Sequence, residues 1–192
     1  MARYGVRIKN LAISDHPFWS APNYRDADVV LLASLFQPGD AEAMPEVIAR
    51  MKEEGKIVVV VGASPEFWGN SVRTRADDII LPALMHGSAK SFPELAAEAN
   101  ARFWEDLDNE EQREREASNL AMAELAAAHG ALYLDRFDFM CEAEAARCLA
   151  VGDDLTKHFY DEHHTTMPGA AFFGRRMAET GWLDPVFEAL AP

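Results

Sequence analysis

Residues 28–62 read DVVLLASLFQPGDAEAMPEVIARMKEEGKIVVVVG, and this stretch decides the fold class. It contains two continuous apolar runs, 28–33 and 57–61, of the kind typical of strands buried on both faces. Between them, apolar residues recur at helical spacing from Asp40, a suitable N-cap, to Gly55, where a C-terminal cap belongs. A strand, a helix and a second strand in this order predict a parallel pair joined by a right-handed crossover.

Outward from this unit, further strand and helix signals alternate along the chain. Residues 6–13 partly alternate apolar and polar side chains, which predicts a strand with one covered face. Residues 64–92 are rich in Pro, Gly and Trp and predict a long irregular segment with one short helix, whereas residues 93–129 have a helical composition. A short strand over 131–135 and a last amphipathic helix over 169–180 follow. This alternation predicts an α/β domain with a mostly parallel sheet.

Length and composition limit the class of protein. The chain has 192 residues and a mass of 21.3 kDa, so residues 1–192 are predicted to form a single domain. A formal charge of −14, from 18 Lys and Arg against 32 Asp and Glu, excludes a basic nucleic-acid-binding surface and disfavours anionic membranes. No apolar run approaches the roughly 18 residues that a membrane span needs.

The expected location follows from the N-terminus and the cysteines. No signal-peptide apolar region follows Met1, so the chain as written is expected in the cytoplasm. Cys141 and Cys148 would then be reduced thiols, with a local disulfide as the alternative.

Residues 157–170, KHFYDEHHTTMPGA, hold the side chains best suited to chemistry. Three of the six histidines fall within seven residues, beside two carboxylates. One interpretation is a metal site, although closed zinc sites take four ligands and no second Cys/His pair is suitably spaced. Another is an exposed structural turn. The third is a catalytic pair of Asp161 and His164, in which the histidine is a general base and the carboxylate fixes its tautomer.

The block DEHHTTMPGA at residues 161–170 resembles the last block of the SGNH/GDSL hydrolase superfamily, where Asp-x-x-His and a polar pair precede a Gly-Ala that opens the final helix. The preceding segments are similar to the SGNH domains attached to bacterial membrane acyltransferases. These segments are the middle strands and following loop (28–33, 55–62 and 64–67), the helix at 119–130, the strand ending at Asp135, and the pair Cys141 and Cys148. The resemblance covers nearly the whole chain from about Gly5.

This resemblance implies the three-layer α/β/α, flavodoxin-like architecture of SGNH hydrolases and a Ser-His-Asp mechanism without cofactor or metal. His164 would be the general base and Asp161 its orienting partner. The substrate would be a small-molecule or carbohydrate ester, with an O-acetyl group on carbohydrate as the expected target. Water as the second substrate would make the protein an esterase, and a sugar hydroxyl would make it an acyltransferase. The alternative is a non-catalytic binding or scaffold domain of the same fold; the oligomeric state is left open.

The same resemblance places the nucleophile in a Gly-Asp-Ser block at the end of the first strand, and this chain contains no such block. Ser14 is a superficial match. Only 13 residues separate it from Asp28, whereas a parallel crossover alone takes about a dozen or more. Residues 6–13 therefore fit the family's second strand, and the first strand and helix, with the serine, are expected upstream of Met1. A fragment of a membrane acyltransferase would be periplasmic or extracellular, where Cys141 and Cys148 could pair.

The sequence also predicts roles for some other polar and aromatic residues. Ser34 and Gln37 could donate hydrogen bonds to an oxyanion, since they stand where the family has an asparagine. Ser64 is expected to be a turn residue ahead of Pro65. Among the four tryptophans, Trp68 is the candidate for stacking on a carbohydrate, and the others are expected to be core or loop anchors.

Overall fold

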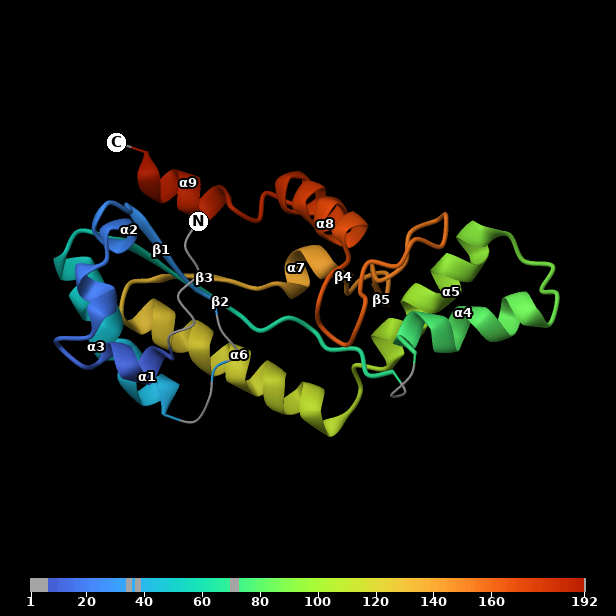
Figure 1. The fold of residues 1–192 in the computed structure, drawn as a ribbon, viewed down its shortest axis with the longest axis horizontal. Coiled ribbons are helices and arrows are strands. Elements are labelled where there is room, and N and C mark those ends of the chain that lie inside the picture. The colour runs from blue at the N-terminus through green and yellow to red at the C-terminus, as the bar shows by residue number, and fades with distance from the viewer. Residues whose placement is uncertain (1–6, 34–35, 37–38, 70–72, 192) are drawn as a thin grey trace. The chain divides into compact units, whose positions relative to one another are not determined.

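Three parallel strands form the main sheet of the computed structural model, which describes residues 7–33, 36, 39–69 and 73–191 (Figure 1). The strands are β1 (Val29–Ala33), β2 (Ile57–Val61) and β3 (Leu132–Leu134), in the order β1-β2-β3. β1 pairs with β2 along its whole length, and β3 pairs with the last three residues of β2. The α/β class and the parallel sheet predicted from the sequence are confirmed.

Helix α3 (Asp40–Glu53) forms the crossover from β1 to β2, as the sequence predicted. Its N-cap is Gly39, which has a φ of 86°, so the expectation that Asp40 caps the helix is wrong. Asp40 is instead the first helical residue, where its buried carboxylate accepts the N–H of Lys9 at 3.1 Å. Gly55 follows the helix with a φ of 77°, a conformation that costs glycine little, so the predicted C-terminal signal is confirmed.

The strand predicted over residues 6–13 is wrong for the described part of that segment, because Ile8–Leu11 form helix α1. Ile8 and Leu11 are three residues apart, so one helical turn buries both side chains in the cluster that also contains α3. A short partial alternation did not distinguish this turn from a strand. A 3-10 helix, η1 (Pro17–Ser20), and helix α2 (Pro22–Arg25) follow, each with proline at its first position.

The chain divides into two compact units, of which the first, the sheet unit, holds residues up to 63, 115–135 and those from 183 onward. Alternate residues of β2, Val58 and Val60, are buried in one cluster with α3 and with the part of α6 (Glu110–Ala128) that belongs to this unit. Helix α9 (Asp184–Leu190) contacts β2, and Figure 1 shows it on the opposite side of the sheet from α6. Helices therefore lie on both faces of β2, as in the predicted three-layer arrangement. β1 is less covered, since Leu31 is 43% exposed, so the prediction that this strand is buried on both faces is wrong.

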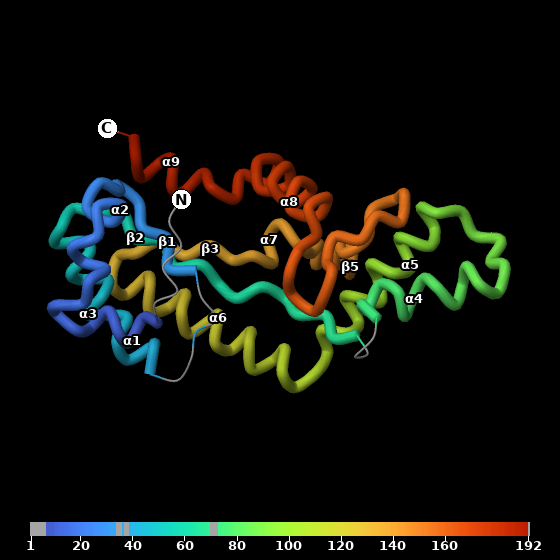
Figure 2. The backbone as a smooth tube through the Cα atoms, viewed as in Figure 1, coloured from blue at the N-terminus to red at the C-terminus, as the bar shows by residue number. Residues whose placement is uncertain are grey.

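The second unit, the site unit, holds residues 64–114 and 136–182. Helices α4 (Arg75–Met85) and α5 (Phe92–Glu105) pack together in it (Figure 2). The helical composition of residues 93–129 is divided between α5 and α6, because Asn109 accepts the N–H of Gln112 at 2.9 Å and so caps a new helix. In the described part of the chain, no helix has the length and apolar character that crossing a membrane requires.

A disulfide hairpin follows the sheet strand β3 in the sequence. Helix α7 (Phe137–Met140) leads into β4 (Cys141–Glu142), which pairs antiparallel with β5 (Arg147–Cys148). A disulfide joins Cys141 and Cys148, so the structure contains the second of the two alternatives that the sequence left open.

Buried Asn100 of α5 fixes the chain that leaves this hairpin. Its amide nitrogen donates to the carbonyl oxygen of Val151 at 2.9 Å. Its amide oxygen accepts the N–H groups of Ala150 and Val151, each at 2.9 Å. Because three hydrogen bonds meet on one buried side chain, the segment that leads to residues 157–166 has a defined start.

Candidate functional site

The segment Asp161–His164 is a short loop closed by main-chain hydrogen bonds. Tyr160 donates its N–H to the carbonyl oxygen of His164 at 3.0 Å. Phe159 and Thr165, the residues on either side, form an antiparallel bridge. The carbonyl oxygen of Glu162 accepts the N–H of Phe67 at 2.8 Å, which ties the loop to the segment after β2. The loop therefore has a fixed backbone on which its side chains are placed.

Helix α8 (Met167–Glu179) begins directly after this loop. Its N-cap, Thr166, accepts the N–H of Gly169 at 3.0 Å and donates its hydroxyl to the carbonyl oxygen of Lys157 at 2.7 Å. Gly169 lies against the backbone of His158, where a Cβ atom would overlap the main chain. The glycine of the Gly-Ala pair is thus required by close backbone approach.

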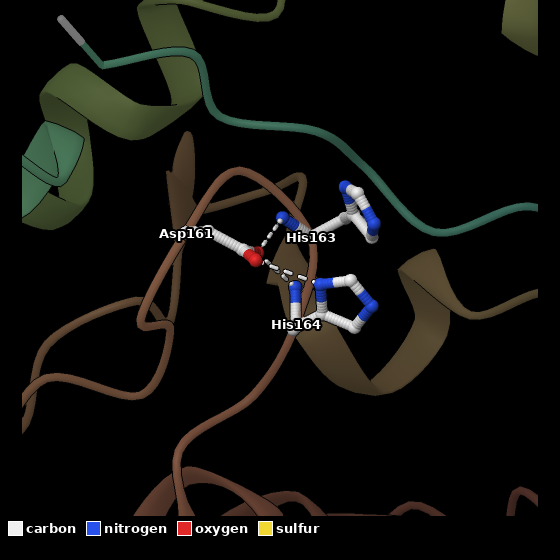
Figure 3. Close-up of side chains that lie close together, drawn as sticks. All are labelled: Asp161, His163 and His164. Carbon is white, nitrogen blue, oxygen red and sulfur yellow. Dashed lines mark hydrogen bonds and ion pairs between the residues drawn. The ribbon is translucent and has the colours of Figure 1, made fainter. Parts of the chain in front are cut away.

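Asp161 and His164 form a close pair (Figure 3). The Nδ1 of His164 donates to Oδ2 of Asp161 at 2.7 Å, and Oδ1 accepts the N–H of His163 at 3.0 Å and of His164 at 2.6 Å. Since the carboxylate only accepts hydrogen bonds, it holds the proton of the neutral imidazole on Nδ1 and leaves Nε2 as the acceptor. Nε2 is turned away from Asp161 and has no hydrogen-bond partner among the described residues.

The electrostatics of Asp161 suit this arrangement. Burial raises the pKa of its carboxyl, but the hydrogen bonds from the N–H groups of His164 and His163 and from the His164 ring outweigh burial and lower the pKa from 3.8 to about 2. The carboxylate is therefore ionised at neutral pH and can stabilise a positive charge on the imidazole. Both side chains remain accessible, with 31% of Asp161 and 55% of His164 exposed.

The other two histidines of the cluster have different surroundings. His158 is buried, its Nδ1 is 2.7 Å from a main-chain carbonyl oxygen, and its ring stacks on Phe172 with centroids 4.2 Å apart. Burial lowers the pKa of His158, so it is a neutral core residue. His163 is exposed, and Figure 3 shows its ring turned away from the carboxylate of Asp161. The structure thus brings Asp161 and His164 together and separates His158 from them.

Asp161, His163 and His164 also form the group that could hold a metal ion, since each offers a ligand atom within 4.8 Å of the others. Both oxygens of Asp161 and the Nδ1 of His164 already take part in hydrogen bonds. Three protein ligands would leave an open coordination position, unlike a closed structural zinc site. The Asp–His pair accounts for the same contacts without an ion.

A polar cavity of about 430 Å³ opens beside Asp161 in the site unit. Trp68 and Tyr160 line it and are 53% and 57% exposed. The Tyr160 ring also lies parallel to the His164 ring, with centroids 5.6 Å apart and planes within 10°. Trp68, which the sequence singled out, therefore lines the same cavity as Asp161, whereas Tyr160 was missed although it directly precedes the Asp-x-x-His pattern.

A second cavity of about 350 Å³ is lined by His163 of the loop, by Thr165, which follows the loop, and by Ser64 and Arg136; we call it the Arg136 cavity. Its remaining walls are mainly apolar side chains. Ser64 is half-buried in the irregular segment after β2, and the described residues around it form no turn, so its prediction as a turn residue is wrong. Arg136 was not identified from the sequence, because a single arginine after a strand does not indicate a binding site. Only the tertiary structure places it in a cavity wall.

The other candidate residues lie elsewhere. Ser14 is exposed in a turn after α1, where its carbonyl oxygen accepts a hydrogen bond from Arg50 at 3.0 Å. It therefore does not end a strand, as the nucleophile of the resembled family does, and it belongs to the sheet unit, whereas the Asp–His pair belongs to the site unit. Ser34 and Gln37, the predicted oxyanion donors, are outside the described residues.

Comparison with known proteins adds a family and a fold. Residues 11–179 match the family described as the SGNH domain fused to AT3 domains. Among solved structures, the periplasmic domain of the lipopolysaccharide acetyltransferase of Salmonella ser. Paratyphi A is similar, with a TM-score of 0.54 and 18% sequence identity. The match covers 79% of this chain and 56% of that structure, so the chain spans little more than half its length. No curated protein matches the sequence significantly.

Proposed function

Because this chain belongs to the family of SGNH domains that are fused to AT3 domains, we propose that it hydrolyses or transfers acyl groups, with O-acetyl groups of carbohydrate as the target. In this proposal His164 is the general base and Asp161 orients it, in a Ser-His-Asp mechanism. The proposal assigns roles to these two residues. The serine is to be identified by the active-site labelling experiment described below.

The observation that carries the proposal is the 2.7 Å hydrogen bond from Nδ1 of His164 to an ionised Asp161. A histidine serves as general base only when its second nitrogen is unprotonated and accessible. The two main-chain N–H groups on Oδ1 fix the carboxylate, so the imidazole is held in the tautomer that leaves Nε2 free. A surface turn would need neither the ring hydrogen bond nor the exposed Nε2.

The proposed reaction passes through a covalent intermediate. A serine hydroxyl attacks the ester carbonyl carbon while Nε2 of His164 takes its proton, and Asp161 stabilises the resulting imidazolium. The carbon–oxygen bond to the leaving alcohol then breaks, and His164 returns the proton to that alcohol. Water or a sugar hydroxyl next gives a proton to Nε2 and attacks the carbonyl carbon of the acyl-serine. The bond between this carbon and the serine oxygen breaks, which releases the acid or the new ester, and His164 returns the proton to the serine oxygen.

The polar cavity supports carbohydrate as the alcohol part of the ester. It places two exposed aromatic rings, Trp68 and Tyr160, beside the carboxylates of Asp161 and Glu162. Binding sites for small polar molecules combine apolar surfaces with a few convergent polar groups. The solved structure with the same fold is a lipopolysaccharide acetyltransferase domain, which agrees with this class of substrate.

We also propose that the domain works outside the cytoplasm. The disulfide between Cys141 and Cys148 is of a kind that persists in oxidising compartments and is rare in the cytosol. The similar solved structure is a periplasmic domain.

The test compares ester hydrolysis by the natural full-length protein with that of two histidine variants. We expect His164→Ala to lower hydrolysis of 4-nitrophenyl acetate by a factor of about 10³ or more, because the general base is lost. His86→Ala is the matched control, because His86 is also exposed in the site unit but lies at the end of α4. A fluorophosphonate probe followed by mass spectrometry identifies the serine, and its labelling should fall in His164→Ala.

Three results would contradict the catalytic proposal. Equal hydrolysis by the natural protein and His164→Ala would remove His164 from the reaction. Absence of both hydrolysis and probe labelling in the natural protein would favour the binding or scaffold domain. Loss of activity on dialysis against EDTA, with recovery on adding Zn²⁺, would favour a metal site at Asp161, His163 and His164.

A further inference from the structure

One wall of the Arg136 cavity is a cation that has no counter-ion among the residues that the structure describes. Arg136 is half-buried, and burial lowers the pKa of its guanidinium. Arg75 and Arg176 of the same unit form ion pairs with Asp106 and Glu142, but Arg136 forms no ion pair or hydrogen bond with any residue of the described ranges. Because a partly desolvated charge without a partner costs folding free energy, its presence in a cavity wall points to a ligand of opposite charge.

Hydrogen-bond donors accompany this guanidinium. The hydroxyl groups of Ser64 and Thr165 line the same cavity, and neither is hydrogen-bonded to a residue that the structure describes. A guanidinium has only donors, in a planar fork that matches the two oxygens of a carboxylate. The polar side of the cavity therefore suits an anion that accepts several hydrogen bonds.

The rest of the cavity is apolar. Phe139, Met140 and Phe173 are buried core residues that line it, and Met177 of α8 adds a half-buried thioether. A small inorganic anion would leave this surface without a contact. A cavity of about 350 Å³ instead suits a small organic ligand with one charged end and an aliphatic body.

We propose that the Arg136 cavity binds a monocarboxylate with a short aliphatic chain. The carboxylate accepts hydrogen bonds from Arg136 and from the hydroxyls of Ser64 and Thr165, and the chain packs against Phe139 and Phe173. Acetate, the acid released from an O-acetyl ester, is the shortest member of this class of ligand, and its identification as the bound acid rests on the proposed function. Binding itself requires no catalysis, so the two proposals can fail separately.

The test is a titration of the ¹⁵N-labelled natural protein with butyrate, followed by amide chemical shifts of the cavity residues. We expect saturable shifts at Thr165 with butyrate, and much weaker shifts with n-butanol, which lacks the charge, or inorganic phosphate, which lacks the chain. Arg136→Met keeps an unbranched side chain and should weaken butyrate binding at least about tenfold, because the charge-assisted hydrogen bonds to the carboxylate are lost. Arg175→Met, an exposed position of α8 outside the cavity wall, should bind like the natural protein.

A second variant blocks the cavity without altering Arg136. Gly174 of α8 lines the cavity, and a Cβ atom there would meet no heavy atom within 4 Å. Gly174→Leu should therefore fold normally and weaken butyrate binding, since it adds a bulky side chain to a residue that lines the cavity. Without ligand, the melting temperature of Arg136→Met should equal or exceed that of the natural protein, because an unpaired charge has been removed.

Several results would overturn this inference. Butyrate shifts that persist unchanged in Arg136→Met, or equal shifts with n-butanol, would show that the guanidinium does not bind the ligand. Stronger binding of phosphate than of butyrate would show that the apolar wall does not bind an aliphatic chain. A lower melting temperature of Arg136→Met would show that the arginine serves the fold. One further result separates the two proposals. If the natural protein binds butyrate but shows neither ester hydrolysis nor probe labelling, this inference is supported and the proposed function is rejected.

Discussion

Replacement of Asp161 by asparagine keeps the shape of the side chain and removes its charge. The asparagine oxygen can still accept the N–H groups of His163 and His164, as Oδ1 does in the natural protein. Its NH₂ group can only donate, so it cannot accept the proton on Nδ1 of His164. We therefore expect Asp161→Asn to lose the charge-dependent part of the folding free energy while the loop stays closed.

The magnitude follows from the pKa of Asp161. A fall from 3.8 to about 2 on folding corresponds to about 2 kcal/mol of unfolding free energy. The side chain is 31% exposed, so screening by solvent reduces the expected contribution to about 1 kcal/mol. Because the pKa is lower in the folded state, this stability is fully present well above pH 3.8 and is lost as the pH falls through about 2.

Urea unfolding of the natural protein and Asp161→Asn at pH 7 and pH 3 measures this contribution. We expect a difference of about 1 kcal/mol at pH 7 and about half of that at pH 3. Asp108→Asn is the control, because Asp108 is 81% exposed and forms a surface ion pair with Arg113, so its substitution should change stability little at either pH. A difference that is absent at pH 7, or that does not shrink at pH 3, would refute the reasoning.

Three other substitutions test how the loop is held. Asn100→Ala leaves three buried main-chain groups unpaired, so the free energy of unfolding in urea should fall by about 2–3 kcal/mol. Serine at both Cys141 and Cys148 removes a cross-link with a sequence separation of 7, and chain entropy predicts a loss of about 2–3 kcal/mol under non-reducing conditions. Gly169→Ala pushes a methyl group into the backbone of His158, so thermal unfolding should show a loss of about 1–3 kcal/mol.

A specific result would contradict each of these three predictions. Unchanged stability of Asn100→Ala would mean that water replaces the lost hydrogen bonds. Two free thiols, titrated in the denatured natural protein without reductant, would contradict the disulfide. A Gly169→Ala protein with natural stability would show that the approach to His158 is looser than the structure indicates.

The fold class could be predicted from local sequence because its signals are local. β2 is buried over most of its length, and residues 57–61 are continuously apolar. Residues 29–33 of β1 are also apolar, but Leu31 is 43% exposed, so this run indicated a strand and not burial on both faces. The Asp–His pair was predictable for the same reason, since residues three apart in one short turn meet whatever surrounds them. The strand prediction for residues 6–13 was wrong because eight residues of partial alternation fit a helical turn as well as a strand. Only contact with α3 decides between the two.

The sequence by itself therefore determined the parallel sheet, the crossover helix and the pairing of Asp161 with His164. Tertiary structure alone decided that Cys141 and Cys148 are bonded, that His158 is a core residue, and that Trp68 lines a cavity with Asp161. It also decided that Arg136, 72 positions along the chain from Ser64, lines a cavity with it. The reason is physical: burial, cavities and unpaired charges are properties of surfaces assembled from distant segments, and no local pattern of residue types encodes them.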